Sequence, residues 1–540
     1  MKGWSWVLLL LHFSGNCLTL ERLSEQPKKL KNVLFIGIDD LRTELGTYGH
    51  SQVVTPNFDS LASKSLVFER AYCQVAVCSP SRTSLLTGRR PDTNHVWMIS
   101  DNEYWRTFTN ATTIPQYFKE NGYVSIGMGK IFHPGRPNGF DDQKYSWSLP
   151  YYHSPLEQQY GPGNHSASWR SFDGFEDNQL PDGQIADNAI ETLRQLKQNH
   201  SNGDDHPFFL AVGFHKPHVP FYAPSKYFDK YPPADQIKLA DNPDVPTDFP
   251  PIARAICPVL DFYTDVMPLF PNYTACKTDV NASFYSEVCH LPDSKAKEIR
   301  RAYYACVSYT DAQIGKVLAE LDSQGFADDT VIILWADHGF QLGEHNHWCK
   351  FTNFEDATHV PFMIRVPGVT DQGMQTKALV ELIDIFPSVT ELAGLEVPPQ
   401  CPEDNKNLLT CVEGISVVPL LSDPEMHWKK AAFSQYPRPW VGFPAIPNKP
   451  PFPRRTPEAV MGYTIRVDSY RFTEWYGFDN TTGVSSFNDI WGTELYNHTE
   501  PVVFFNDENV NLAVKPEMKS VVEELRRMLQ AGWRAALPPV

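Results

Sequence analysis

The sequence predicts an α/β fold in which helices sandwich a large, mainly parallel sheet, with a smaller α+β subdomain at the C-terminal end. Two observations lead to this prediction. Between residues 30 and 400, short apolar runs alternate with stretches of helical periodicity, the pattern of strands joined by crossover helices. At 540 residues the chain also exceeds what one hydrophobic core normally organises, so a second unit is expected.

Five apolar runs have the length of strands buried on both faces, and four longer stretches have the spacing of helices. The predicted strands are 33–38, 124–128, 208–213, 331–336 and 361–366. The predicted helices are 57–70, 184–198, 295–321 and 379–392. After residue 424 the pattern changes to short strand-like runs at 431–436, 461–466 and 470–476. We therefore divide the chain into a leader at 1–19, a main domain at 20–424 and a C-terminal subdomain at 425–540.

The leader has the composition of a secretory signal peptide, because Lys2 precedes an apolar run to Phe13 and then small residues. No later apolar run is long enough to span a bilayer. Seven Asn-X-Ser/Thr sequons fit passage through the secretory pathway. These predicted glycosylation sites are Asn110, Asn164, Asn199, Asn272, Asn281, Asn480 and Asn497.

The ten cysteines suit an oxidising compartment. Cys401 and Cys411 flank a short polar loop and are predicted to form a local disulfide. Cys257, Cys276 and Cys289 lie in an insertion, where we expect one pair. The net charge of −17 argues against general nucleic-acid binding, which needs a basic surface. An anionic substrate would need positive charges gathered in a cleft.

Titratable side chains follow four of the predicted strands. In chain order they are Asp39 and Asp40, Lys130 and His133, His215 and His218, and Asp337, His338 and Lys350. Taken singly, each has an ordinary interpretation as a helix cap, a structural histidine or a surface lysine. Ligands of open α/β sheets bind outside the carboxyl ends of the strands, so the joint pattern favours a site.

Three carboxylates and one histidine in this set, Asp39, Asp40, Asp337 and His338, suit a hard cation such as Ca²⁺ or Mg²⁺ better than zinc. The lysines and the remaining histidines beside it would then bind a tetrahedral anion. Glu344, further along the last loop, is interpreted as a supporting or turn residue.

Cys78 begins the stretch CSPSRTSLLTGRR, whose spacing predicts a helix. A thiol at a helix N-terminus lies where amides and the helix dipole favour anions, and Arg82 one turn later can reach the same anion. These surroundings would lower the thiol pKa, so a cysteine nucleophile of the phosphatase or protease type is one interpretation. Against it, the stretch lacks the glycines of a phosphate loop, and an exposed thiolate is short-lived in an oxidising compartment.

Cys-X-Pro-Ser-Arg, followed by a helix that ends in Thr-Gly-Arg, resembles the signature of the sulfatase family. The resemblance continues through NVLFIGIDDLR, GKIFHPG, FFLAVGFHKPHVPF and DHGFQLGEHNHW. It implies an alkaline-phosphatase-like sulfatase fold, in which the C-terminal subdomain completes the substrate cleft of the catalytic domain. It also implies a formylglycine made from Cys78 by the formylglycine-generating enzyme. One Ca²⁺ per chain would be held by Asp39, Asp40, Cys78, Asp337 and His338.

The resemblance also implies catalytic roles for six residues, Cys78, Arg82, Lys130, His133, His218 and Lys350. Lys130, Lys350 and His218 would neutralise the sulfate oxygens, and His218 would protonate the leaving oxygen. His133 would take the proton of the second hydroxyl of the hydrated aldehyde, and Arg82 would orient that group. A serine or an unmodified cysteine lacks this second hydroxyl, which is why the chemistry needs the modification.

The implied activity is that of a lysosomal exo-sulfatase. It would remove the 2-O-sulfate of non-reducing-end L-iduronate from heparan sulfate and dermatan sulfate. Lys449 resembles the contact to the uronate carboxylate, and Arg89 and Phe340 are further candidate substrate contacts. Alternatives are a sulfatase for another sugar, aryl or lipid sulfate, and a non-catalytic secreted protein that binds glycosaminoglycans. A phosphatase on the related scaffold is disfavoured, because that scaffold normally has Ser or Thr as nucleophile.

Overall fold

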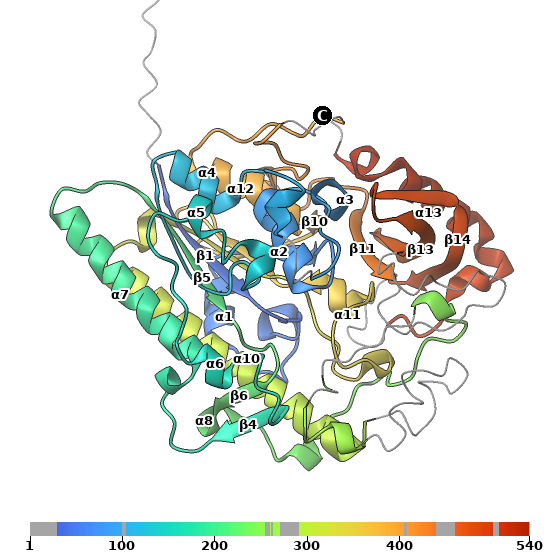
Figure 1. The fold of residues 1–540 in the computed structure, drawn as a ribbon, viewed down its shortest axis with the longest axis horizontal. Coiled ribbons are helices and arrows are strands. Elements are labelled where there is room, and N and C mark those ends of the chain that lie inside the picture. Colours follow the sequence, from blue (N-terminus) through green and yellow to red (C-terminus); the bar gives the residue numbers. More distant parts are fainter. Residues whose placement is uncertain are drawn as a thin grey trace, which may run out of the picture.

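A large mixed sheet lies between layers of helices, and a smaller antiparallel sheet lies beside it (Figure 1). The computed structural model describes residues 30–99, 104–253, 260, 263–269, 291–403, 408–438, 459–499 and 507–538. Several predicted features lie outside these residues, namely the leader 1–19, Cys257, Cys276, Cys289, Asn272, Asn281 and Lys449.

The large sheet comprises β1 (Asn32–Ile38), β2 (Leu66–Tyr72), β3 (Val124–Gly129), β5 (Phe208–Phe214), β7 (Thr330–Ala336), β8 (His359–Val360), β9 (Phe362–Arg365) and β10 (Met374–Glu381). Its strand order is β10-β2-β9-β7-β1-β5-β3, and β8 pairs with β2. β1 is parallel to β5 and β7, and β3 is parallel to β5. β9 runs antiparallel to both of its neighbours, β7 and β2. The sheet is therefore mainly parallel, as predicted, with β8 and β9 reversed.

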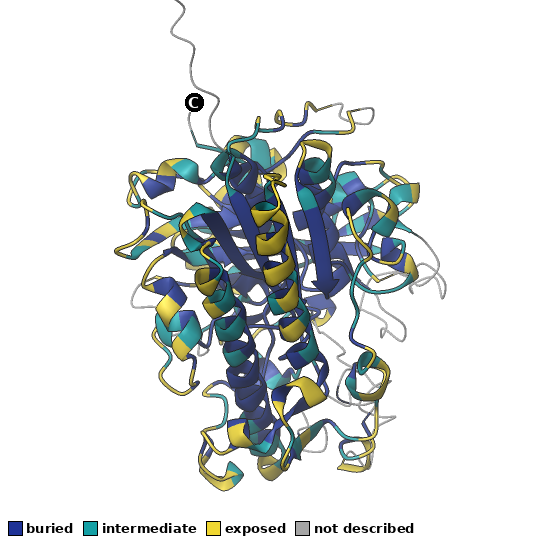
Figure 2. Cartoon of the chain, turned by 90° about the vertical axis from the view of Figure 1, so that its left-hand side faces the viewer, coloured by how far each residue is buried: buried dark blue, intermediate teal, exposed yellow. Residues whose placement is uncertain are grey.

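Helices cover both faces of the large sheet. The helices of this part of the chain are α1 (Pro56–Ala62), α2 (Cys78–Thr87), α3 (Pro91–Asn94), α4 (Ile114–Glu120), α5 (Gln143–Ser146), α6 (Glu157–Tyr160), α7 (Pro181–Ser201), α8 (Ser225–Phe228), α10 (Asp293–Ser323), α11 (Glu355–Thr358) and α12 (Ile385–Ala393). Figure 2 looks onto the side where α7 lies and shows buried strands behind helices whose outward faces are exposed. A short two-stranded sheet of β4 (Trp169–Phe172) and β6 (Phe221–Pro224) lies near α8 and α10.

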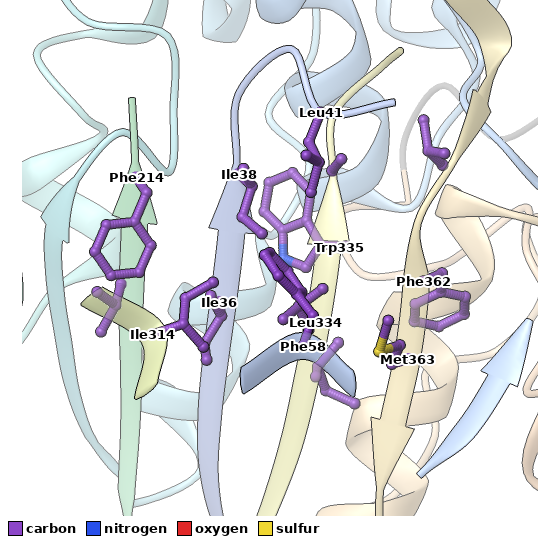
Figure 3. Close-up of a cluster of buried hydrophobic side chains, with 14 of the residues drawn as sticks. Ile36, Ile38, Leu41, Phe58, Phe214, Ile314, Leu334, Trp335, Phe362 and Met363 are labelled. Atoms are coloured by element: carbon purple, nitrogen blue, oxygen red, sulfur yellow. The ribbon is translucent and has the colours of Figure 1, made fainter. Parts of the chain in front are cut away.

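The core forms because the central strands are apolar on both faces. Every residue of β1, β5 and β7 is buried. Figure 3 shows Ile36 and Ile38 of β1 meeting Phe58 of α1 and Ile314 of α10. Gly37 leaves room for the neighbouring strand, since a Cβ atom there would lie 2.7 Å from the indole of Trp335. Burial of aliphatic and aromatic side chains at this density is the main favourable term in folding.

Two predicted helices are partly strands. The helix predicted at 57–70 ends at Ala62, and the next apolar run forms β2. The helix predicted at 379–392 begins as the end of β10, and α12 starts only at Ile385. β2 and β10 pair in parallel with each other, so each supplies the partner that makes the other a strand. Short apolar runs fit a buried helix or a buried strand equally well, which is why periodicity misassigned them. The other predicted strands and helices are confirmed, with small shifts of their ends.

The smaller sheet has the order β11-β12-β13-β14, and all of its pairs are antiparallel. Its elements are β11 (Ala432–Arg438), β12 (Val460–Arg466), β13 (Tyr470–Asp479) and β14 (Val484–Asn497), with α13 (Lys519–Ala531) packed on one face. Neither β14 nor α13 was predicted from the sequence. For β14 the reason is that polar residues occupy most of its length. The boundary near residue 424 stays a prediction, and the sheet itself begins at Ala432.

All described sequons are reachable from solvent. Asn110, Asn199 and Asn497 are exposed, whereas Asn164 and Asn480 are half-buried. Within the part of the chain that the structure describes, no helix combines the length and the apolar composition needed to cross a membrane. Glycosylation at these asparagines stays a prediction.

A buried ionic network joins the smaller sheet to α11 of the main domain. Glu508 accepts hydrogen bonds from the backbone amide of Glu355 at 2.9 Å and from Arg471. His498 Nε2 lies 3.0 Å from a Glu508 oxygen, and Arg466 pairs with Glu355 at 3.1 Å. Burial and Arg466 lower the pKa of His498, but Glu355, Asp507 and Glu508 raise it further, to about 8. His498 is therefore a cation at neutral pH and holds carboxylates from two units together.

The stability that this histidine contributes should depend on pH. Because its folded pKa is raised from 6.5 to about 8, the contribution is complete below pH 6.5 and is lost as pH rises through 8. The shift corresponds to about 2 kcal/mol. We expect the difference in unfolding free energy between the wild type and His498→Gln to shrink by about that amount between pH 6 and 9, measured by chemical denaturation. The exposed His206→Gln variant should show no such trend, and a difference that is constant with pH would contradict the ionic role.

Candidate active site

The four central parallel strands bring the predicted site residues to one edge of the sheet. Asp39 follows β1 directly, and Asp337 follows β7. Lys130 follows β3, and His218 lies just beyond β5. Cys78 is the first residue of α2, whose ten residues are all buried. Since β7, β1, β5 and β3 are neighbours with the same direction, these segments meet at their carboxyl ends.

Cys78 lies at the centre of the cluster and is 2% exposed. Its Sγ lies 3.4 Å from Asp39 Oδ1 and 3.3 Å from His338 Nε2. The ammonium groups of Lys130 and Lys350 lie 3.7 Å and 3.6 Å from the same sulfur. A side-chain group at position 78 therefore contacts a carboxylate, an imidazole and two ammonium groups at once.

Arg82 is fully buried and contacts residues that follow three different strands. Its Nε donates to Asp337 Oδ2 at 2.7 Å, and its Nη1 donates to the carbonyls of Lys130 and Ile131. Its Nη2 lies 3.6 Å from Asp39 Oδ1 and makes no hydrogen bond to the described residues. Arg82 thus connects the ends of three strands and keeps one donor beside the central pocket.

Asp40 is the most constrained residue of the site. Its φ of 60° lies in the left-handed region, which is costly for a residue with a Cβ atom and is found most often at functional positions. Its Oδ1 accepts from Lys350 Nζ at 2.5 Å, and its amide donates to Asp337 Oδ1 at 3.2 Å. Its Oδ2 is buried without a hydrogen-bond partner among the described residues. An orphaned carboxylate oxygen of this kind is suited to bind a cation.

The donor set fits a hard divalent cation. Asp39, Cys78, Asp337 and His338 each offer an atom, and these atoms lie within 4.8 Å of one another. His338 Nδ1 donates to the carbonyl of Gly339 at 3.0 Å, which leaves Nε2 free to act as a ligand. Metal-binding histidines are commonly oriented by this kind of bond to a backbone carbonyl. Two of these four donors are carboxylate oxygens, and Asp40 offers a third beside Cys78, so the set suits Ca²⁺ or Mg²⁺.

The charges of the site stabilise one another. Burial raises the pKa of Asp39, but nearby cations, Lys130 first among them, hold it well below its ordinary value. Burial and the neighbouring Asp39 outweigh Lys350 and raise the pKa of Asp40. Burial opposes the charged form of Lys130 and of Lys350, yet Asp39 and Asp40 raise their pKa values above the usual range. The lysines therefore stay charged although both are almost fully buried.

The thiol of Cys78 differs from the sequence-based expectation. Its pKa is raised, chiefly by burial and secondarily by Asp39, rather than lowered by the helix N-terminus. Desolvation of the thiolate exceeds the help of the two lysines and the helix dipole. An unmodified Cys78 is therefore a poor nucleophile here, which removes the main support for a thiolate mechanism.

Two histidines border the pocket with defined tautomers. His133 Nδ1 donates to the carbonyl of Pro134 at 3.0 Å, and His218 Nδ1 donates to the carbonyl of Val219 at 2.6 Å. In both rings Nε2 is left to exchange a proton with a substrate. Burial, assisted by Lys130, lowers the pKa of His133 to about 3. Burial and Lys350 also lower the pKa of His218, so both rings are neutral before an anion binds.

A second buried ionic network supports the loop after β7. Arg42 binds Glu344 through two hydrogen bonds of 3.0 Å and 3.1 Å, and Arg300 Nη1 lies 3.1 Å from the same carboxylate. These arginines also donate to the carbonyls of Phe340 and Leu342. The contacts agree with the interpretation of Glu344 as a supporting residue. Arg42 was not among the predicted site residues, although it stands two residues after Asp40.

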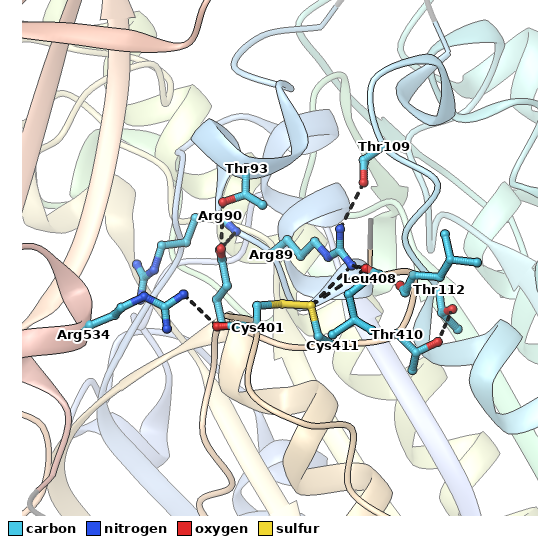
Figure 4. Close-up of a disulfide and its surroundings, with 12 residues drawn as sticks. Arg89, Arg90, Thr93, Thr109, Thr112, Cys401, Leu408, Thr410, Cys411 and Arg534 are labelled. Atoms are coloured by element: carbon cyan, nitrogen blue, oxygen red, sulfur yellow. Dashed lines mark hydrogen bonds between the residues drawn. A yellow bond between two sulfur atoms is a disulfide. The ribbon is translucent and has the colours of Figure 1, made fainter. Parts of the chain in front are cut away.

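The structure does not bring Arg89 or Phe340 to this pocket. Figure 4 shows Arg89 at the Cys401–Cys411 disulfide, which forms as predicted. Its guanidinium donates to the carbonyl of Leu409 at 3.1 Å, so it holds the disulfide loop. Phe340 is fully buried, with its ring centroid 6.0 Å from that of Tyr303. Neither side chain can contact a substrate here, because each is committed to packing or to backbone carbonyls.

Comparison with known proteins agrees with this geometry. The sulfatase family model matches residues 31–395. The chain belongs to the sulfatase family. Iduronate 2-sulfatase of Homo sapiens is 38% identical over 92% of this chain and 94% of that protein. Iduronate 2-sulfatase of Mus musculus is 38% identical over 91% of this chain and 94% of that protein. The protein is thus a sulfuric ester hydrolase.

Among solved structures, the phosphonate monoester hydrolase of Silicibacter pomeroyi superposes with a TM-score of 0.65 at 22% identity. The match covers 94% of this chain and 96% of that chain. At this identity the likeness shows the fold alone. The fold is the alkaline-phosphatase-like sulfatase fold, as predicted, and this sulfatase carries its pocket where that fold places the ends of its central strands.

Binding of a cation should be visible as thermal stabilisation. A ligand that binds only the folded state adds about 2.7 kcal/mol at a hundredfold excess over its dissociation constant. We expect Ca²⁺ to raise the melting temperature of the wild type and to have little effect on Asp337→Asn, which lacks one anionic ligand. The measurement is a calcium titration followed by differential scanning fluorimetry. The rise in melting temperature caused by Ca²⁺ is compared between the two proteins, because the substitution also removes the partner of Arg82 and so lowers the starting melting temperature. The exposed Asp229→Asn variant is the matched control. A wild type that does not respond to Ca²⁺ or Mg²⁺ would contradict the cation site.

Proposed function

We propose that this sulfatase hydrolyses the 2-O-sulfate ester of L-iduronate at the non-reducing end of heparan sulfate and dermatan sulfate. It would use a formylglycine formed from Cys78 and one bound Ca²⁺. The observation that carries the proposal is the buried cluster around Cys78, in which carboxylates, lysines and a histidine converge on a single side chain. The similarity to iduronate 2-sulfatases over nearly the whole chain supports the choice of substrate.

The charge balance of the pocket favours an anionic ester. Three carboxylates, Asp39, Asp40 and Asp337, face three cations, Lys130, Lys350 and Arg82. The cluster is therefore close to neutral by itself, and a bound divalent cation would make it positive. In a buried site of low dielectric, that excess charge would attract a sulfate ester and stabilise the negative charge that develops on its oxygens.

Residue 78 is the natural position for the nucleophile. A hydrated aldehyde there would supply one hydroxyl to attack sulfur and a second hydroxyl whose deprotonation frees the sulfate. Ca²⁺ held by the carboxylates and His338 would supply positive charge beside the attacking hydroxyl. The residues of this chain do the rest: Lys130 and Lys350 hold the sulfate oxygens, and Arg82 keeps the pocket walls in register.

The two histidines divide the proton transfers. His218 Nε2 would protonate the sugar oxygen as it leaves, because the negative charge of a bound ester opposes the burial that keeps this ring neutral. His133, neutral and with Nε2 free, would accept the proton from residue 78 in the second half of the reaction. Proton transfer by two separate groups allows one to act as acid while the other acts as base.

We also propose that the chain passes through the secretory pathway to the lysosome and meets the formylglycine-generating enzyme on the way. The signal-like composition of residues 1–19 and the solvent-reachable sequons support this route. Lys449, outside the described residues, is proposed as the contact to the uronate carboxylate.

The substrate is tested by sulfate release at acidic pH from three compounds. They are a heparin-derived disaccharide ending in iduronate 2-sulfate, a counterpart ending in 6-O-sulfated glucosamine, and an aryl sulfate. We expect selective release from the first, and loss of that release in Cys78→Ser, which cannot form the aldehyde. Mass spectrometry of the Cys78 peptide checks the conversion directly. Release from the other two compounds alone would keep the sulfatase and reject iduronate as its substrate.

The proposed acid role of His218 predicts a dependence on the leaving group. A sugar alkoxide is a poor leaving group and needs a proton, whereas a phenoxide needs it far less. We expect His218→Gln to lower kcat on the iduronate disaccharide by about 10²–10⁴-fold and to affect aryl sulfate hydrolysis much less. Steady-state kinetics on both substrates provide the measurement, with the exposed His427→Gln as control. Equal losses on both substrates would assign His218 to sulfate binding instead.

A further inference from the structure

Residues 139–142, which follow the His133 loop, form an uncommon left-handed turn. The φ angles are 56° at Gly139, 55° at Phe140, 63° at Asp141 and 54° at Asp142. Side chains with a Cβ atom rarely adopt this region, and consecutive residues do so less often still. Such strain persists only where surrounding contacts over-determine the backbone, and it is common near functional sites.

Strong contacts hold this turn. The carboxylate of Asp142 accepts hydrogen bonds from Arg106 Nε at 2.6 Å, Arg106 Nη2 at 2.7 Å, Ser146 Oγ at 2.6 Å and the hydroxyl of Tyr104. Asp141 pairs with His153 Nε2 at 2.7 Å. Both carboxylates are buried, so they bind groups within and around the turn and do not face solvent.

The turn is attached directly to the pocket. The amide of Phe140 donates to the carbonyl of Gly135 at 3.0 Å, which closes the loop that follows His133. Asn138 is buried between Ser79 Oγ and Thr83 Oγ1, each 3.4 Å away, on the first turns of α2. Residues 134–140, called here the rim loop, therefore pack on the helix that begins with Cys78.

The rim loop presents one cation and one aromatic ring to solvent. Arg136 is exposed, and Phe140 is 68% exposed, unusually high for a phenylalanine. The side chain of Arg136 has no hydrogen bond or ion pair with the described residues. Arg136 stands three residues after His133, so their Cα atoms are at most about 10 Å apart. In a chain with a net charge of −17, a solvent-facing cation beside an anion site marks a place for negative charge.

We propose that Arg136 and Phe140 form a subsite for the sugar that follows the terminal sulfated residue. Phe140 would lie against the apolar face of the pyranose ring, and Arg136 would bind a sulfate or carboxylate on that sugar through its planar fork. A polysaccharide whose terminal sugar reaches Cys78 must continue outward past the surrounding loops, and residues 134–140 form one that packs on the helix of Cys78. The inference extends the proposed function, because it assumes a sulfated glycan as substrate.

Two disaccharides that differ only at the second sugar test the subsite. Both end in iduronate 2-sulfate, and only one carries a sulfate on the following amino sugar. Arg136→Gln should lower kcat/KM about tenfold on the doubly sulfated compound, roughly the value of one charge-assisted hydrogen bond. It should leave hydrolysis of the singly sulfated compound and of an aryl sulfate near wild-type rates. Arg136→Lys should retain part of the preference, and Phe140→Ala should raise KM for both disaccharides but not for the aryl sulfate.

The control is Arg527→Gln, an exposed arginine on α13. Equal effects of Arg136→Gln on both disaccharides, or no effect on either, would overturn the subsite. If the wild type cleaves the aryl sulfate but neither disaccharide, the proposed substrate fails while the subsite can still be measured. In that case the doubly sulfated disaccharide is used as an inhibitor of aryl sulfate hydrolysis. A tenfold higher inhibition constant in Arg136→Gln supports the subsite, and an unchanged constant overturns it.

Discussion

Mutual neutralisation of buried charges around Cys78 is the constraint on which the rest of the site depends. Asp39, Asp40 and Asp337 are fully buried, and each is stable only because Lys130, Lys350 or Arg82 lies against it. An unpaired charge at this depth would cost several kcal/mol, roughly the stability of a whole domain. The site therefore tolerates little displacement of any element that carries one of these groups.

The scaffold around this cluster has two separate supports. Parallel strands bring the charged groups to one edge, and the Arg42–Glu344–Arg300 network holds the loop that carries Asp337 and His338. The smaller sheet is tied to the same region through Glu355, the first residue of α11, by arginines and a charged histidine. Both supports use buried ion pairs, which add little net stability but penalise every arrangement that separates them. Precise placement is what they contribute.

Sequence patterns predicted the elements that are buried on both faces and the residues that follow them. The central strands, the long helices and the groups at the strand ends were all readable, because these features depend on local composition and on the rule that sites form at carboxyl ends. β2 and β10 were not, since each is a strand only through pairing with the other. β14 lacked an apolar pattern. The burial of Phe340 could not be predicted either, because it packs against Tyr303, which is distant in sequence.

The sequence by itself determined the family, the position of Cys78 and the set of charged groups, because these are encoded as residue types at fixed spacings. Only the tertiary structure decided how they act. It raised the pKa of Cys78 through burial, although the helix N-terminus alone would have lowered it. It assigned Arg89 to the disulfide loop, and it left Arg136 and Phe140 exposed beside a turn that Arg106 holds. Desolvation and long-range contacts are properties of the packed chain, so no local pattern can report them.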